Sequence, residues 1–142
     1  MNRRMAKLQI TKIFTYSIMF NYILLISAIL FVTLDSIYLN LAKSYFKNQV
    51  TLVQGSAVKM DLLAAILCYI FLIVGLNYFI IQPRRSVVDA FFFGLIIYAV
   101  FETTNKSLFS NWSWLTVIMD SLWGGVLFAI TTYLISKIRK MI

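Results

Sequence analysis

The sequence contains no histidine, a single cysteine, a single proline and five acidic residues among 142. Without histidine, neither a His/Cys zinc site nor a mechanism that needs an imidazole base is available. Cys68 has no second cysteine in the chain with which to form a disulfide. Charged residues make up 13% and hydrophobic residues 61% of the chain, whereas soluble domains have about 25% and 45–50%. The composition therefore excludes an ordinary soluble domain and favours a membrane protein.

Four apolar runs, each long enough to cross the hydrocarbon core of a membrane, follow one another along the chain. We expect helices over about residues 13–41, 61–81, 87–107 and 114–136. Pro83 ends the second run, because proline cannot continue a helix. The connection 43–59 is the longest, and residues 41–46 are expected either to prolong the first helix or to form an amphipathic surface turn. The predicted fold is all-α, a single transmembrane domain over residues 1–142 built as an antiparallel bundle of four transmembrane helices.

The basic residues predict how the chain is oriented. Four transmembrane helices place both termini on one side of the membrane. On that side lie the nine basic residues of the N-terminal segment, the second loop and the C-terminal tail, and four lie on the other side. The nine are Arg3, Arg4, Lys7, Lys12, Arg84, Arg85, Lys137, Arg139 and Lys140. Since Lys and Arg of short loops concentrate in the cytoplasm, we expect both termini to be cytoplasmic.

The net charge of +8 comes from these same basic residues, which flank the apolar runs. Basic residues that flank apolar runs contact lipid headgroups, so the expected partner is the lipid bilayer and not nucleic acid. Trp112 and Trp114 lie where the fourth helix enters the membrane from the outside, and we expect both in an aromatic belt at this interface.

The acidic residues all lie within or beside the apolar runs: Asp35, Asp61, Asp89, Glu102 and Asp120. A charged side chain at mid-bilayer costs about 2.5–3.5 kcal/mol, so a chain keeps one only where something compensates. At a rise of 1.5 Å per residue, Asp35 lies about 33 Å along the first helix, Glu102 about 26 Å along the third and Asp120 about 9 Å into the fourth. These three carboxyl groups should converge on the outer third of the membrane, whereas the other two lie near helix ends.

Polar and small residues share the helical turns of these acids. Asn105 and Lys106 follow Glu102 at i+3 and i+4, which makes a Glu102–Lys106 ion pair geometrically natural. Trp123 follows Asp120 at i+3, which places its indole beside the carboxyl group. The glycines within the runs are expected to be packing sites where helices approach closely: Gly75, Gly94, Gly124 and Gly125.

Three stretches of this sequence resemble the motifs of a known family. They are Leu34-Asp35-Ser36-Ile37-Tyr38-Leu39, the segment from Gly94 to Asn105, and Asp120-Ser121-Leu122-Trp123-Gly124. The family is domain of unknown function family 2177, short predicted membrane proteins with four helices, so the resemblance covers nearly the whole chain. It singles out Asp35, Thr104, Asn105, Asp120, Trp123 and Gly124. Members usually have aspartate where Glu102 stands and tryptophan where Tyr38 stands, and the longer arm of Glu102 changes any coordination geometry.

Two interpretations of the polar residues remain open. Intramembrane acids mark ion, proton or substrate sites, but polar side chains also fasten helices together, at about 0.6 kcal/mol for each link. The leading hypothesis is a multispanning membrane protein with an outward-facing acidic pocket that binds or moves a proton, cation or small polar solute without a cofactor. The candidate pocket residues are Asp35, Glu102, Thr104, Asn105, Asp120 and Trp123.

The inner halves of the helices carry few polar residues, which disfavours conduction by a monomer and leaves a homo-oligomer or other membrane proteins as partners. One alternative is a lipid-associated enzyme or accessory factor, whose carboxylates supply acid–base chemistry or hold a divalent ion. Catalysis is disfavoured, because the chain has neither histidine nor a motif for an activated nucleophile. The other alternative is a purely structural protein of a membrane-enclosed assembly.

Overall fold

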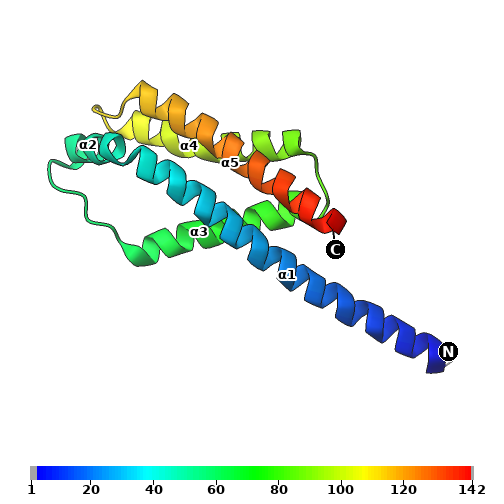
Figure 1. The fold of residues 1–142 in the computed structure, drawn as a ribbon. Coiled ribbons are helices and arrows are strands. Elements are labelled where there is room, and N and C mark those ends of the chain that lie inside the picture. The colour runs from blue at the N-terminus through cyan, green and yellow to red at the C-terminus, as the bar shows by residue number, and fades with distance from the viewer. Residues whose placement is uncertain (1–2, 142) are drawn as a thin grey trace.

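The computed structural model describes residues 3–141, apart from the side chains of Arg3, Arg4, Ala6, Lys7, Phe14 and Tyr16. Three of the basic residues used for the orientation, Arg3, Arg4 and Lys7, therefore have side chains outside the described part. The described backbone is helical, and its helices are joined by short turns and loops (Figure 1). The elements are α1 (Arg3–Leu41), α2 (Lys43–Gln54), α3 (Leu62–Leu76), the π-helix η1 (Asn77–Ile81), α4 (Val87–Leu108) and α5 (Trp114–Met141).

The long helices run in alternating directions, as an antiparallel bundle requires (Figure 1). The start of α1, the end of α5 and the α3–α4 turn lie at one end, here called the terminal end, and α2 and the α4–α5 loop lie at the other, the loop end. Within the described residues, four segments are long and apolar enough to cross a membrane: Leu8–Leu41, Leu62–Ile81, Val87–Leu108 and Trp114–Met141. The prediction of an all-α polytopic membrane protein is confirmed.

The surface of the bundle is apolar and its interior is partly polar. Ile29, Phe71 and Phe101 are each more than half exposed, whereas Ser27 and Thr131 are completely buried. A soluble protein places large apolar side chains inside and most polar ones outside. The exposed apolar side chains are therefore explained by lipid around the bundle, where burying polar groups against neighbouring helices is favourable.

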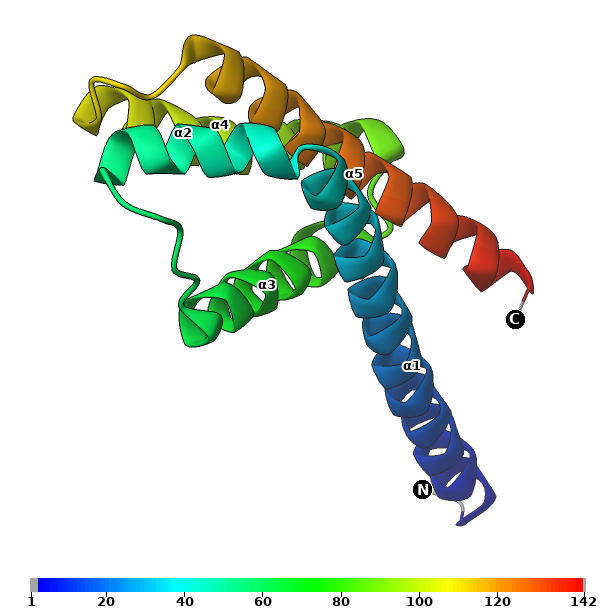
Figure 2. The ribbon, with the colours of Figure 1, turned by 60° about the vertical axis from the view of Figure 1, so that its left-hand side comes forward.

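The α1–α2 connection differs from both alternatives expected from the sequence. Residues 43–54 form a separate helix that turns sharply away from the end of α1 (Figure 2). Gly55 ends α2 in the left-handed conformation at φ 69°, and its N–H donates to the Thr51 carbonyl oxygen. Glycine is favoured there because it has no Cβ to clash. The other bounds also shift: α1 starts at Arg3 and projects beyond the bundle, and α5 continues to Met141 (Figure 2).

The second span widens into a π-helix before Pro83. The N–H of Gln82 donates to the Asn77 carbonyl oxygen at 2.8 Å, and the N–H of Arg85 donates to that of Ile80 at 2.9 Å. Both bonds reach five residues back, the π-helical pattern, which often accompanies functional sites. Arg84 follows with φ 55°, in the left-handed region that residues with a Cβ rarely adopt. The turn into α4 is thus held in an unusual conformation at the terminal end.

Helices α4 and α5 form the most extensive pair of the bundle, and glycines set their separation. A Cβ added to Gly94 would collide with the Gly124 carbonyl oxygen, and one added to Gly124 would collide with the Tyr98 ring. At Gly125 the added atom would lie 2.7 Å from Cε2 of Phe91, but at Gly75 it would make an ordinary 3.8 Å contact with Phe93. The α4–α5 contact therefore depends on three of the four glycines.

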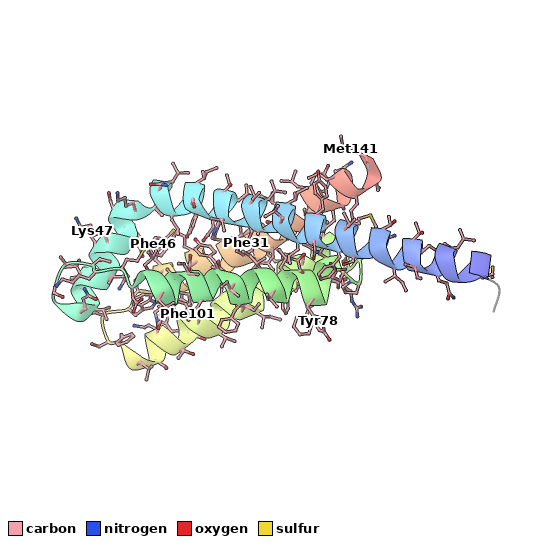
Figure 3. The ribbon with its side chains drawn as sticks, turned by 90° about the horizontal axis from the view of Figure 1, so that it is seen from below. Phe31, Phe46, Lys47, Tyr78, Phe101 and Met141 are labelled. Atoms are coloured by element: carbon pink, nitrogen blue, oxygen red, sulfur yellow. The ribbon has the colours of Figure 1, made fainter. Side chains whose placement is uncertain are left out.

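Aromatic rings fill the middle of the bundle. Phe31 on α1 and Phe128 on α5 are both completely buried, and their ring centroids lie 5.2 Å apart in an edge-to-face arrangement. Phe93 on α4 adds a second contact to Phe128 at 5.7 Å. Figure 3 shows Phe31 in the interior of the bundle, whereas Phe101 on α4 is exposed. We call Phe31, Phe93 and Phe128 the aromatic layer.

Candidate functional site

Asp35 lies near the loop end of α1, with only 6% of its surface exposed. Its Oδ2 accepts a 2.7 Å hydrogen bond from the Tyr69 hydroxyl of α3, and its Oδ1 accepts a 2.8 Å bond from Nε1 of Trp123 on α5. The Trp123 indole stacks on the Tyr38 ring at 4.3 Å between centroids. One carboxyl group therefore links three transmembrane helices.

Glu102 on α4 is more deeply buried, with 1% of its surface exposed. Its Oε2 accepts a 2.7 Å hydrogen bond from Nε1 of Trp112, a residue of the α4–α5 loop that is itself 9% exposed. Lys106 instead reaches the Ser110 carbonyl oxygen at 3.5 Å and lies over the Trp114 ring. Glu102 thus bonds to an indole where the sequence suggested a lysine.

Asp120 on α5 completes a group of three acids, here called the carboxyl cluster: Asp35, Glu102 and Asp120. The carboxyl groups of Asp120 and Glu102 lie within hydrogen-bonding reach of each other. The Tyr38 hydroxyl lies against Asp120 but makes no hydrogen bond of standard geometry among the described residues. Electrostatic interactions connect Tyr38 with all three acids. The convergence expected from the helical rise is therefore present at the loop end.

Helix α2 covers this end of the bundle through a second polar network. Gln49 is 5% exposed, and its Nε2 donates to the Asn111 carbonyl oxygen at 2.8 Å. The Thr116 hydroxyl donates to Oε1 of Gln49 at 3.1 Å, and it lies 2.9 Å from the Tyr45 hydroxyl. Since Thr116 precedes Asp120 by one helical turn, this network lies at the loop end, about one turn of α5 from Asp120.

Comparison with protein-family models finds one that covers most of the chain, including α2 and the carboxyl cluster. The model is described as "Predicted membrane protein (DUF2177)", and it matches residues 18–136. The chain belongs to this family. A search of curated proteins and a search of solved structures found no match.

Two other residues expected at the site of this DUF2177 member, Thr104 and Asn105, lie away from the carboxyl cluster. Thr104 is exposed, and its hydroxyl donates to the Val100 carbonyl oxygen of its own helix at 2.7 Å, away from the carboxyl cluster. Asn105 is half-buried, and its backbone carbonyl oxygen accepts a hydrogen bond from the Phe109 N–H where α4 ends. Asp35, Glu102, Asp120 and Trp123 come together, whereas Thr104 and Asn105 belong to the end of α4.

The two remaining acids of the DUF2177 chain are helix caps. The Asp61 side chain accepts the Ala64 N–H at 3.1 Å at the start of α3. Asp89 forms a capping box with Ser86 at the start of α4. Among the side chains that the structure describes, no group of three or more His, Cys, Asp or Glu residues is arranged to hold a metal ion.

Several residues of the site were not found from the sequence. Tyr69 is one aromatic residue among many in an apolar run, and nothing local identifies it as the partner of Asp35. Trp112 was expected in the aromatic belt, and this was wrong, because it is buried against Glu102. In the other half of this DUF2177 bundle, Nδ2 of Asn77 donates to the Ser27 hydroxyl at 2.8 Å. Ser27 and Asn77 are fifty positions apart in the sequence but form one buried contact.

Proposed function

We propose that Glu102 and Asp120 form a proton-binding pair through which this membrane protein takes up and moves protons. The observation that carries the proposal is the close approach of the two carboxyl groups on α4 and α5. Two ionised carboxylates at hydrogen-bonding distance repel each other, whereas one shared proton turns the repulsion into a hydrogen bond. The pair is therefore suited to binding one proton and titrating as a unit.

Burial favours a proton over larger ligands at this pair. Glu102 is 1% exposed, and its Oε2 is already bonded to the Trp112 indole. A hydrated cation or a polar solute would have to lose much of its hydration at such a site, which is costly unless many new ligands replace the water. A proton needs only one oxygen from each of these two neighbouring carboxyl groups.

The network under α2 supports access to the pair from the loop end. Gln49 and the hydroxyl groups of Tyr45 and Thr116 join the α4–α5 loop to the turn of α5 that precedes Asp120. A hydroxyl group both donates and accepts a hydrogen bond, so the hydroxyl groups of this network are suited to passing a proton toward the acids. With the termini in the cytoplasm, as the basic residues predict, the loop end faces outward and the pair takes protons from outside.

The aromatic layer favours gated transfer over a continuous channel. Along α1, Phe31 lies between Asp35 of the carboxyl cluster and Ser27 of the buried contact with Asn77. The edge-to-face contact of Phe31 with Phe128 leaves apolar rings between these two polar regions. An apolar constriction blocks conduction until it opens. Proton release toward the terminal end would therefore require the rings to move.

The proton on the pair can be measured by infrared spectroscopy of the protein in lipid nanodiscs. We expect the wild-type protein to show a carboxylic-acid C=O band at neutral pH that disappears on alkalinisation. The double variant Glu102→Gln/Asp120→Asn should lack this band, because both possible carriers of the proton are amides. Asp61→Asn, which removes an exposed helix-capping acid, is the matched control and should retain it. A band that persists in the folded double variant would refute the proposal.

A second function, fastening of helices, is favoured for Asp35 by a separate observation. Both of its oxygens accept hydrogen bonds from neutral donors, Tyr69 on α3 and Trp123 on α5. Each oxygen is therefore bonded to a donor on a different helix. We therefore assign Asp35 to stability, and the Glu102–Asp120 pair to proton binding.

A further inference from the structure

The terminal end contains a strongly basic cavity that the proton pair does not explain. Its volume is about 240 Å³, and it lies between the α3–α4 turn and the last turns of α5. Four of its eight lining residues are basic and none is acidic. The polar lining residues are Arg84, Arg85, Arg139, Lys140, Thr132 and Ser136. Cations brought together in this way repel one another unless an anion lies between them.

The cavity is built into the fold. Nη1 of Arg139 donates to the Ile81 carbonyl oxygen at 2.7 Å, which fixes this guanidinium against the end of the second span. Arg84 is held at φ 55° by the turn that follows the π-helix, in the left-handed conformation that is unfavourable for a residue with a Cβ. Asp89 lies outside the lining, where it accepts bonds from the N–H and the hydroxyl of Ser86 and interacts electrostatically with Arg85. The basic side chains are thus brought together by backbone geometry.

A buried hydroxyl without a partner provides independent support for a ligand. Thr132 lines the cavity, is only 6% exposed, and its Oγ1 has no hydrogen-bond partner among the described residues. Thr131, the next residue, donates to the Leu127 carbonyl oxygen of its own helix at 2.8 Å. A buried hydroxyl that lacks a partner is destabilising. An anion in the cavity would give Thr132 an acceptor.

We propose that this cavity binds the phosphate group of an anionic phospholipid. A second hollow of about 80 Å³ shares Arg84 and Arg139 with the first, and its other lining residues include Met19, Phe20 and Ile23 of α1. The two arginines therefore have hydroxyl and basic groups on one side and apolar side chains on the other. A phospholipid has the same arrangement, with its acyl chains below the phosphate. Basic pockets between transmembrane helices recognise such headgroups, and arginine binds phosphate oxygens in pairs.

Native mass spectrometry of the full chain in detergent, with equal amounts of phosphatidylglycerol and phosphatidylcholine, tests this proposal. The wild-type protein should bind phosphatidylglycerol preferentially. Each basic residue near an anionic headgroup contributes about fivefold in affinity, so Arg84→Gln/Arg85→Gln should weaken binding about 25-fold. The matched control Lys43→Gln/Lys47→Gln removes two exposed basic residues of α2 at the loop end and should leave binding unchanged. Equal binding of both lipids by the wild type, or equal losses in both variants, would overturn the proposal.

Thr132→Val separates the binding role of the hydroxyl from folding. Valine has nearly the same shape and carries a methyl group in place of the hydroxyl, which has no partner among the described residues, so the melting temperature should not fall. Phosphatidylglycerol binding should weaken about fivefold through the lost hydrogen bond, and unchanged binding would remove Thr132 from the site.

Competition identifies the source of the phosphate. Inorganic phosphate and glycerol 3-phosphate should displace the lipid only weakly if its acyl chains contribute through the α1 side. Displacement at concentrations equal to that of the lipid would show a site for a free phosphate compound and overturn the lipid assignment.

Discussion

Asp35→Ala should lower the free energy of unfolding by about 2–4 kcal/mol, because a buried donor left without its acceptor costs about 1–3 kcal/mol. The variant leaves two such donors, the Tyr69 hydroxyl and Nε1 of Trp123. It also breaks the only carboxyl link among the described residues that joins α1, α3 and α5. Unfolding in mixed detergent micelles, followed by circular dichroism, measures the loss.

Two further variants make this result interpretable. Thr33→Ala changes an exposed residue of the same helix half a turn away and should leave the unfolding curve nearly unchanged. Asp35→Asn keeps one acceptor oxygen but presents an amide N–H₂ to the other donor, so it should lie between the wild type and Asp35→Ala. If Asp35→Ala unfolds like the wild type, the carboxyl group does not fasten the helices.

Gly94→Ala is the second substitution with a large expected effect. The added methyl group would meet the Gly124 carbonyl oxygen and the Phe128 ring, and a backbone atom cannot rotate away. Overpacking of a close contact costs about 1–3 kcal/mol, and α4 would have to move away from α5. We expect a lower melting temperature and, since Glu102 and Asp120 lie on these two helices, a weakened carboxyl pair.

The matched control is Gly75→Ala. It introduces the same methyl group at another transmembrane glycine, where the nearest atoms of Phe93 lie at an ordinary 3.8 Å. Alanine is also the better helix former, by about 1 kcal/mol, so this variant should be as stable as the wild type or more stable. Equal melting temperatures for the two variants would refute the glycine-dependent contact of α4 and α5.

The spans and the depth of the acids could be predicted from the sequence because both depend on local quantities. Run length and composition identify a transmembrane helix, and a constant rise per residue places Asp35, Glu102 and Asp120 at similar depths. The rise per residue, however, does not determine which faces of different helices meet. Thr104 was included by resemblance, yet it lies on the exposed side of α4, while Tyr69 was missed.

The structure of the loop end could not be predicted for a related reason. Helix α2 is docked by bonds from Gln49 and Tyr45 to residues more than sixty positions away, and no local pattern shows such partners. Trp112 was placed at the interface because tryptophan usually lies there. Its indole N–H instead bonds to Glu102, a preference that depends on a buried acid ten residues earlier. Long-range hydrogen bonds therefore account for most of the differences.

The most direct test of the central claim, that Glu102 and Asp120 take up and move protons, is proton flux into liposomes. A pH-sensitive dye inside the vesicles reports the flux under an imposed membrane potential, and melting curves confirm that each reconstituted variant is folded. We predict flux for the wild type and for Asp61→Asn, and flux no greater than in protein-free liposomes for Glu102→Gln/Asp120→Asn. Undiminished flux in the folded double variant, or none in the wild type, would contradict the account.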